Sequence, residues 1–213
     1  MIRVGVAGAA GRMGTAACAA VLAAQDMELA GRADPALGTT LASILGDCDV
    51  VIDFTQPAAA LGNARECVAA GVHVVIGTTG FDLAALEGLS GANIFAAPNF
   101  AIGAVLMMRF AAEAARYLPA AEVVELHHAA KVDRPSGTAK LTAELMGGDV
   151  PIHSVRLPGL NAHQEVILGG EGETLRIRHD AISREAYTPG VLLALERLSS
   201  LPPGLTVGLD TLI

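Results

Sequence analysis

Two adjacent histidines and a nearby lysine are the residues best placed to do chemistry in this chain. Residues 122–140 read EVVELHHAAKVDRPSGTAK, so His127 and His128 end an apolar run and Lys131 follows in the next loop. A histidine titrates near neutral pH and can act as a general acid. The lysine adds a full positive charge. The cluster therefore predicts a proton donor beside a cation.

The same segment supplies backbone donors for an anion. Ser136, Gly137 and Thr138 stand at the expected start of a helix, where N–H groups can hold a carboxylate. Each part has a plainer explanation, since a histidine pair is often structural, Lys131 alone is a solvated side chain, and Pro-Ser-Gly-Thr alone is a helix cap. Their occurrence together, in a chain with only 17% charged residues, favours one substrate site.

Metal binding is the alternative for the two histidines. Neighbouring strand residues point to opposite faces, so His127 and His128 cannot easily share one ion. No third ligand at a clear spacing accompanies them. We therefore expect no metal site.

A glycine-rich loop near the start of the chain predicts nucleotide binding. Gly8, Gly11 and Gly14 stand in GAAGRMG, between an expected strand and an expected helix. Such glycines permit a tight turn, approach of a pyrophosphate to the backbone, and close helix packing. Asp34 ends the next strand and is placed to accept hydrogen bonds from an adenine ribose. The spacing GxxGxxG also fits a glycine-rich turn in another doubly wound domain, and that alternative stays open.

The elements that must position these motifs change in kind after about residue 100. Before it, strands are expected at 2–7, 27–34, 49–54, 73–76 and 93–97, and helices at 12–24 and 57–70. After it, helices are expected at 101–117, 137–146 and 191–198, and strands at 122–128, 163–168 and 173–179. The alternation in the first part predicts a parallel sheet with right-handed crossovers. A Gly-rich hairpin signal at 169–172 predicts an antiparallel block in the second.

Composition excludes several classes of protein. The chain has 213 residues, 52% of them hydrophobic, and a net charge of −8 without a Lys/Arg run, so neither disorder nor nucleic-acid binding is expected. No signal peptide and no membrane span are expected, because no apolar stretch of about 20 residues lacks charge and glycine. Three cysteines are too few for a disulfide scaffold. These features predict a cytoplasmic globular protein.

Taken in order, the motifs resemble those of the 4-hydroxy-tetrahydrodipicolinate reductase (dihydrodipicolinate reductase) family. The carrying segments are GAAGRMG (8–14), DFT (53–55), GTTG (77–80), APNF (97–100) and ELHHAAKVDRPSGTA (125–139), with a weaker match at 172–184. The resemblance implies an α/β fold, with an N-terminal Rossmann dinucleotide-binding domain and a C-terminal α+β domain whose open mixed sheet builds a homotetramer. The implied ranges are 1–101, 102–184, and a C-terminal helix at 185–213 that returns to the first domain.

The resemblance also implies an oxidoreductase of diaminopimelate and lysine biosynthesis. Its substrate would be a cyclic imine dicarboxylate, and its cofactor NADH or NADPH. His127 would be the general acid, and Lys131 would complete the catalytic pair. The residues implied to bind substrate are His128, Ser136, Gly137 and Thr138. Those implied to meet the cofactor are Gly8, Gly11, Arg12, Met13, Asp34, Phe54, Gly77, Thr79, Ala97 and Phe100.

The chain departs from the family pattern beside the ribose-binding acid and in the second domain. Pro35 replaces an arginine that often pairs with a 2′-phosphate, so Asp34 disfavours NADPH by charge repulsion, which Arg12 and Arg32 could partly offset. We therefore expect NADH to be favoured, or both cofactors to be used. The segment 146–166 is short for the family and lies near the expected tetramer surface.

Two other functions stay open. One is an imine or amine dehydrogenase on the same scaffold, whose substrate would have one carboxylate. Such a substrate would not need both Lys131 and the helix start at Ser136, Gly137 and Thr138. A non-catalytic NAD(P)-binding regulator would be expected to lose the proton donor or the carboxylate site. The choice of His127 over His128 rests on the resemblance and not on their spacing.

Overall fold

The computed structural model describes residues 1–213 and divides them into two compact units. The first unit comprises Met1–Phe100 and Tyr187–Ile213, and the second comprises Ala101–Ala186. The ranges expected from the sequence place the junctions after residues 101 and 184. None of the helices has the length and apolarity that crossing a bilayer would need.

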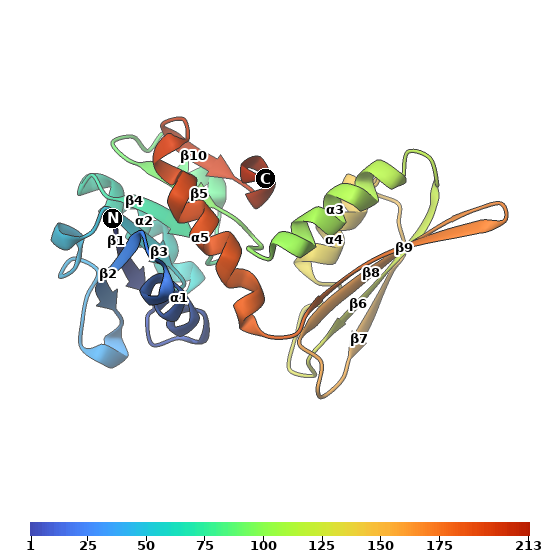
Figure 1. Ribbon diagram of the computed structural model, residues 1–213, viewed down its shortest axis with the longest axis horizontal. Helices are drawn as coiled ribbons and strands as arrows, with labels where there is room; N and C mark the ends of the chain where they lie inside the picture. Colours follow the sequence, from blue (N-terminus) through green and yellow to red (C-terminus); the bar gives the residue numbers. More distant parts are fainter. The chain divides into compact units, whose positions relative to one another are not determined.

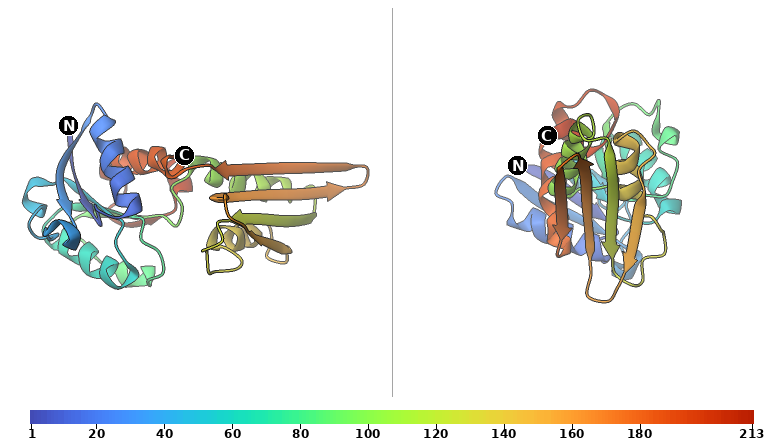
Figure 2. Two further views of the ribbon diagram at one scale, coloured as in Figure 1. Left: turned by 90° about the horizontal axis from the view of Figure 1, so that it is seen from below. Right: turned by 90° about the vertical axis from the view of Figure 1, so that its right-hand side faces the viewer.

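The first unit is a six-stranded parallel sheet between helices (Figure 1). Its strand order is β10-β5-β4-β3-β1-β2. The strands are β1 (Ile2–Ala7), β2 (Met27–Ala33), β3 (Val50–Asp53), β4 (His73–Ile76), β5 (Asn93–Ala96) and β10 (Gly204–Val207). Helices α1 (Arg12–Ala23) and α5 (Thr188–Arg197) pack on one face and α2 (Pro57–Ala69) on the other (Figure 2). The predicted parallel α/β fold is confirmed.

The apolar runs of the central strands explain this layered arrangement. Every residue of β3 and β5 is buried, as are Val74, Val75 and Ile76 of β4. A strand covered by helices on both faces needs such a continuous apolar run. The order of the strands reverses between β1 and β3, and ligands of open α/β sheets bind at the carboxyl ends of strands at such a point.

The C-terminal segment contributes more to this sheet than the sequence predicted. The expected final helix is present, but β10 follows it and pairs in parallel with β5. Asn93 on β5 donates from Nδ2 to the carbonyl oxygens of Leu198 and Leu201, at 2.8 and 3.2 Å. The end of the chain is therefore part of the first unit. A strand of four residues that begins at Gly204, directly after two prolines, gave too weak a pattern to be predicted.

The second unit is a four-stranded mixed sheet with two helices on one face (Figure 2). The order is β7 (Ile152–Arg156), β6 (Ala120–His127), β8 (Ala162–Gly170), β9 (Glu173–Ala181). Helix α3 (Ile102–Ala114) packs on β8 and β9, and α4 (Gly137–Leu145) packs on β6 and β7. The expected hairpin is the antiparallel β8–β9 pair. Strand β7, which runs parallel to β6, was not predicted.

The two faces of this sheet differ in chemistry. Val123, Val166 and Leu168 are fully buried and pack with Ala111 of α3 and Ala139 of α4. Because side chains alternate along a strand, the residues between them point to the other face, which no helix of this unit covers. On β6, Glu125 and His127 therefore share the helix-covered face with Val123.

Candidate active site

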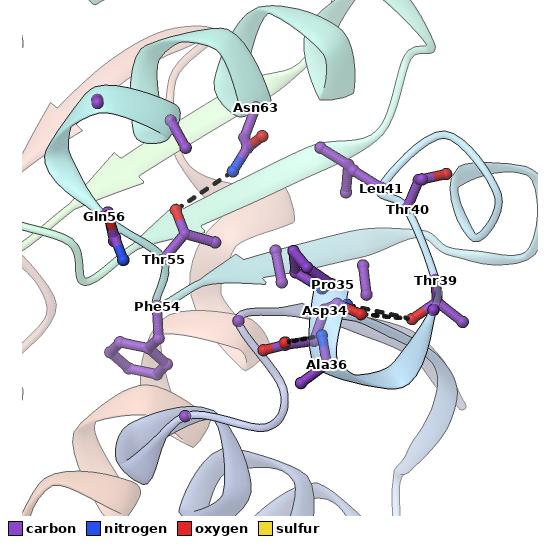
Figure 3. Close-up of a pocket in the computed structure, with 17 residues that line it drawn as sticks. Asp34, Pro35, Ala36, Thr39, Thr40, Leu41, Phe54, Thr55, Gln56 and Asn63 are labelled. Atoms are coloured by element: carbon purple, nitrogen blue, oxygen red, sulfur yellow. Dashed lines mark hydrogen bonds between the residues drawn. The ribbon is translucent and has the colours of Figure 1, made fainter.

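A cavity of about 1080 Å³ lies where the strand order of the first sheet reverses (Figure 3). Its walls come from the loops that follow β1, β2 and β3, and four predicted cofactor residues line it: Gly8, Gly11, Asp34 and Phe54. Small-molecule and cofactor sites commonly enclose about 300–1,000 Å³. The cavity thus has the place and the size of a dinucleotide site.

Two glycines of the glycine-rich loop stand where the backbone leaves no room for a side chain. Gly8 has φ 76°, and a Cβ there would overlap the Phe54 carbonyl group, whereas one at Gly14 would overlap the Gly8 carbonyl. No side chain caps the start of α1 at Gly11. The first N–H groups of a helix have no partner within the helix and favour anions. This backbone therefore fits the pyrophosphate of a dinucleotide.

Asp34 connects the end of β2 to the glycine-rich loop. Its Oδ1 accepts a hydrogen bond from Ala36 N at 2.9 Å, and its Oδ2 accepts one from Ala10 N at 3.0 Å. Each carboxylate oxygen has a second lone pair, so the group can accept further bonds from a ribose. Asp34 therefore lines the cavity with acceptor capacity left for the predicted ribose contact.

The remaining predicted cofactor residues lie outside this cavity lining. The Phe54 ring stands edge-on to Phe100 with centroids 6.2 Å apart, and a side chain at Gly77 would overlap that ring. Phe54, Gly77 and Phe100 are thus in one cluster beside the cavity. The others are Arg12 and Met13 in the first turn of α1, Thr79 in the loop after β4, and the buried Ala97 after β5.

Asp53, the first residue of the DFT segment, is a buried carboxylate that was not among the predicted site residues. It ends β3 and is fully buried. Its oxygens accept hydrogen bonds from Thr55 N and Oγ1 at 3.0 and 2.8 Å, from Asn63 Nδ2 at 2.7 Å and from Thr78 Oγ1 at 2.7 Å. One side chain therefore fixes the loops that follow β3 and β4.

We expect Asp53→Asn to lower the free energy of unfolding by about 1–3 kcal/mol, because an amide nitrogen would face donors that now meet an oxygen. The loosened loops should also raise KM for the cofactor. Urea unfolding and cofactor titration measure the two effects. Asp82→Asn is the control, since Asp82 caps a short helix by accepting one exposed hydrogen bond from Ala84 N. Unchanged stability in Asp53→Asn would contradict the assigned role.

In the second unit, His127 ends β6 in contact with a buried ion pair. Its Nδ1 forms a short hydrogen bond with Glu125 Oε2. Glu125 is 0% exposed and accepts two bonds from Arg156 of β7, from Nη1 at 2.9 Å and from Nη2 at 2.7 Å. His128 is exposed and lies on the opposite face. Only His127 is therefore held by charged partners.

Lys131 and the start of α4 follow in the loop after β6. Lys131 Nζ forms an ion pair with Asp133 Oδ1 at 2.7 Å. Ser136 is buried and caps α4, accepting a bond from Ala139 N at 3.2 Å, whereas Gly137 is exposed and Thr138 is half-buried. The exposed part of this helix start thus begins at Gly137.

Burial and neighbouring charges set the protonation of this cluster. Burial lowers the pKa of His127 below its ordinary value; Glu125 opposes this shift, while Lys131 and Arg156 add to it. Burial alone would raise the pKa of Glu125, but hydrogen bonds from Arg156, Ser154 and His127 together hold that pKa below its usual range. Glu125 is therefore ionised, and His127 gives up its proton readily.

The family of the chain follows from its match over nearly every residue. Residues 2–100 match the family described as dihydrodipicolinate reductase, N-terminus, and residues 103–213 match its C-terminus. This chain belongs to the dihydrodipicolinate reductase family. It is therefore an oxidoreductase, because its curated relatives are named as reductases.

Relatives and a solved structure with the name of this reductase match the chain over its whole length. The 4-hydroxy-tetrahydrodipicolinate reductase of Thermobifida fusca (strain YX) is 47% identical, with 100% of this chain and 99% of the relative covered. That of Desulfitobacterium hafniense (strain DSM 10664 / DCB-2) is 43% identical, covering 100% and 98%. A dipicolinate-bound dihydrodipicolinate reductase from Paenisporosarcina sp. TG-14 superimposes with a TM-score of 0.87 at 32% identity, covering 100% of both chains. A probable dehydrogenase from Thermotoga maritima, at 13% identity and a TM-score of 0.70, shows the shared fold alone.

Sequence reasoning missed the charged partners of His127 in this reductase. Glu125 stands two residues before His127, so both side chains lie on one face of the strand. A carboxylate at a buried position of an apolar strand was the available signal. Arg156 gave no such signal, because it lies on β7, a strand of five residues that was not expected.

Proposed function

We propose that this chain reduces 4-hydroxy-tetrahydrodipicolinate, or its dehydrated form dihydrodipicolinate, to tetrahydrodipicolinate in diaminopimelate and lysine biosynthesis. The observation that carries the proposal is the arrangement of His127, Lys131 and the start of α4 after one strand. It joins a proton donor, a cation and helix N–H groups. A cyclic dicarboxylate needs two anion contacts and one proton, and these residues can supply them.

The chemistry divides between the cofactor and this chain. A reduced nicotinamide supplies a hydride to the ring, and the reaction also needs one proton. His127 donates that proton to the charge that develops as the hydride arrives, while Lys131 and the backbone at Gly137 and Thr138 hold the carboxylates. When the substrate is the 4-hydroxylated form, it also loses its hydroxyl group as water. His128 contributes to substrate binding from the exposed end of β6.

We expect kcat/KM for NADH to equal or exceed that for NADPH. A 2′-phosphate would meet the Asp34 carboxylate, and Pro35 offers no positive charge beside it. Asp34→Asn is expected to move the ratio toward NADPH by about tenfold, equivalent to about 1.4 kcal/mol. Asp26→Asn, an exposed acid just before β2, should leave the ratio unchanged. A wild-type preference for NADPH by a large factor would contradict the assignment.

We also propose that the open face of the second sheet builds a homotetramer in the cytoplasm. Helices α3 and α4 cover only the other face. Val124, Leu126 and Ile167 lie half-buried on the open face, beside the ion pair of Glu122 with His153. A second sheet could cover these apolar side chains. Sedimentation equilibrium measures the assembly, and Leu126→Lys should shift it toward smaller species.

The deciding experiment follows nicotinamide oxidation by absorbance. Pyruvate, aspartate semialdehyde and the preceding synthase would generate the substrate in place, and NADH and NADPH would be tested in parallel. Oxidation should depend on the synthase and, at substrate concentrations below KM, should fall by at least about tenfold in Lys131→Ala. Measurable cofactor binding with no turnover would favour an amine dehydrogenase or a regulator instead.

A further inference from the structure

We propose that Glu125 and Arg156 are positioning residues for the proton donor. Their buried ion pair fixes the His127 ring through Nδ1 and leaves Nε2 as the nitrogen that delivers the proton. The inference rests on the proposed function, because it assigns how the same site controls its acid.

The register of the sheet brings the three side chains together. In the parallel pairing of β6 with β7, His127 lies opposite Arg156 and Glu125 lies opposite Ser154. All three side chains point to the helix-covered face, so the guanidinium reaches back to the carboxylate of Glu125. Both Nη atoms of Arg156 bond this carboxylate, at 2.9 and 2.7 Å. A bidentate pair of this kind fixes the plane of the carboxylate.

The guanidinium is itself held by the backbone. Arg156 Nη1 donates to the carbonyl oxygen of Val155, and Nη2 donates to that of Asp133, both at 2.7 Å. The side chains of Arg156 and Glu125 are 2% and 0% exposed. The bond to Asp133 also joins the pair to the loop that carries Lys131. One guanidinium therefore anchors both the acid and the cation of the site.

The carboxylate determines which ring nitrogen is available. Glu125 is ionised and can only accept, so His127 Nδ1 must carry the proton of their hydrogen bond. In the protonated ring the remaining N–H is then at Nε2, which is the group free to act as the acid. A carboxylate that holds one imidazole nitrogen fixes ring orientation and tautomer in many sites.

Arg156 prevents the carboxylate from making His127 too weak an acid. The charged groups around the ring are Glu125 on the same strand, Arg156 on β7, and Lys131 in the following loop, which is paired with Asp133. A lone carboxylate would stabilise the imidazolium and hold its proton. With Arg156 compensating that charge, Glu125 orients the ring while the pKa of His127 stays below its ordinary value.

Glu125→Gln tests the role of the carboxylate. Glu125 Oε1 and Oε2 both accept bonds from Arg156, and Oε2 also accepts from His127. A glutamine must put its NH₂ group at one of these places, where it meets a donor. We expect kcat to fall by about 10- to 100-fold, the range typical when a hydrogen-bond partner that orients a functional histidine is lost. KM should stay within about threefold of the wild-type value. The pKa of His127 should fall, because a negative charge is removed.

Arg156→Met and the double variant separate positioning from folding. Arg156→Met should raise the pKa of His127, because a positive charge beside the ring is removed. The decrease of kcat/KM with rising pH should then occur at a higher pH. The double variant, Glu125→Gln with Arg156→Met, removes both charges of the pair. Its melting temperature should therefore be closer to that of the wild type than the melting temperatures of the single variants are, whereas kcat should stay low. Glu113→Gln is the control, since Glu113 forms an exposed ion pair with Arg116 at the end of α3, away from His127 and from the open face of the sheet. It should change neither kcat nor the pKa of His127.

Histidine NMR titration of the free protein gives a readout independent of turnover. His127→Gln identifies the signal of His127 among the six histidines. An unchanged pKa of His127 in folded Glu125→Gln, or recovery of kcat in the double variant, would overturn the positioning role. An inactive wild-type enzyme with synthase-generated substrate would instead overturn the proposed function, and the titration would still report whether the pair controls the ring.

Discussion

His127→Gln is expected to lower kcat by about 10²–10⁴-fold and to leave KM within a few-fold. Glutamine can fill the space of the ring and accept or donate a hydrogen bond, but it cannot give up a proton near neutral pH. The ion pair behind it stays intact, so the variant should fold. Steady-state rates of cofactor oxidation measure the loss.

His128→Gln is the matched control for this variant. His128 is the next residue, yet it is exposed and its backbone N–H bonds to Asn161 O at 3.3 Å. We expect a change in KM and a smaller change in kcat, because the family resemblance gives His128 a binding role. An equal or larger loss of kcat at His128 would reverse the assignment of the acid.

The pH dependence of the wild-type enzyme follows from the same residue. A general acid must be protonated, so the rate falls as pH rises through its pKa. Burial lowers the pKa of His127 in the free protein, and kcat/KM should therefore begin to fall below the ordinary histidine value of about 6.5. The bound dicarboxylate adds negative charge beside the ring and favours the imidazolium. The fall in kcat should thus occur at higher pH than the fall in kcat/KM.

The first unit and its nucleotide loop could be predicted because their signals are local. The segments 73–76 and 93–97 are short apolar runs typical of strands covered on both faces, and the structure has strands at 73–76 and 93–96. Gly8 directly follows a strand in the turn that leads to a helix, and it has a positive φ there. Such features depend on neighbours in the sequence, so a pattern reveals them.

The residues that support His127 could not be predicted, because their contacts depend on strand pairing. Arg156 lies 31 residues after Glu125, on a strand too short to show a clear period. Likewise β10 pairs with β5 from the far end of the chain. Asp53 was visible in the DFT segment, but its partner Thr78 follows a different strand. A sequence shows which groups are present, whereas the register of a sheet decides which groups meet.

Lys131→Ala is expected to lower kcat/KM for the substrate by about 10- to 150-fold, mainly through KM. A hydrogen bond to a charged group contributes about 1.5–3 kcal/mol, which converts to that range. Lys140→Ala is the control, because Lys140 is the only other lysine of the chain and is exposed on α4. It should change kcat/KM by less than about twofold, since exposed charges contribute little.

The partner of Lys131 sharpens this prediction. Lys131 holds the pKa of the Asp133 carboxyl below its usual range, so Lys131→Ala leaves a carboxylate near the expected place of an anionic substrate. Part of the loss should therefore be repulsion. Adding Asp133→Asn to Lys131→Ala should recover several-fold of kcat/KM, whereas Asp133→Asn alone should lower KM by freeing the lysine for the substrate. If the double variant is no better than Lys131→Ala, Asp133 does not face the substrate and the lysine acts without competition.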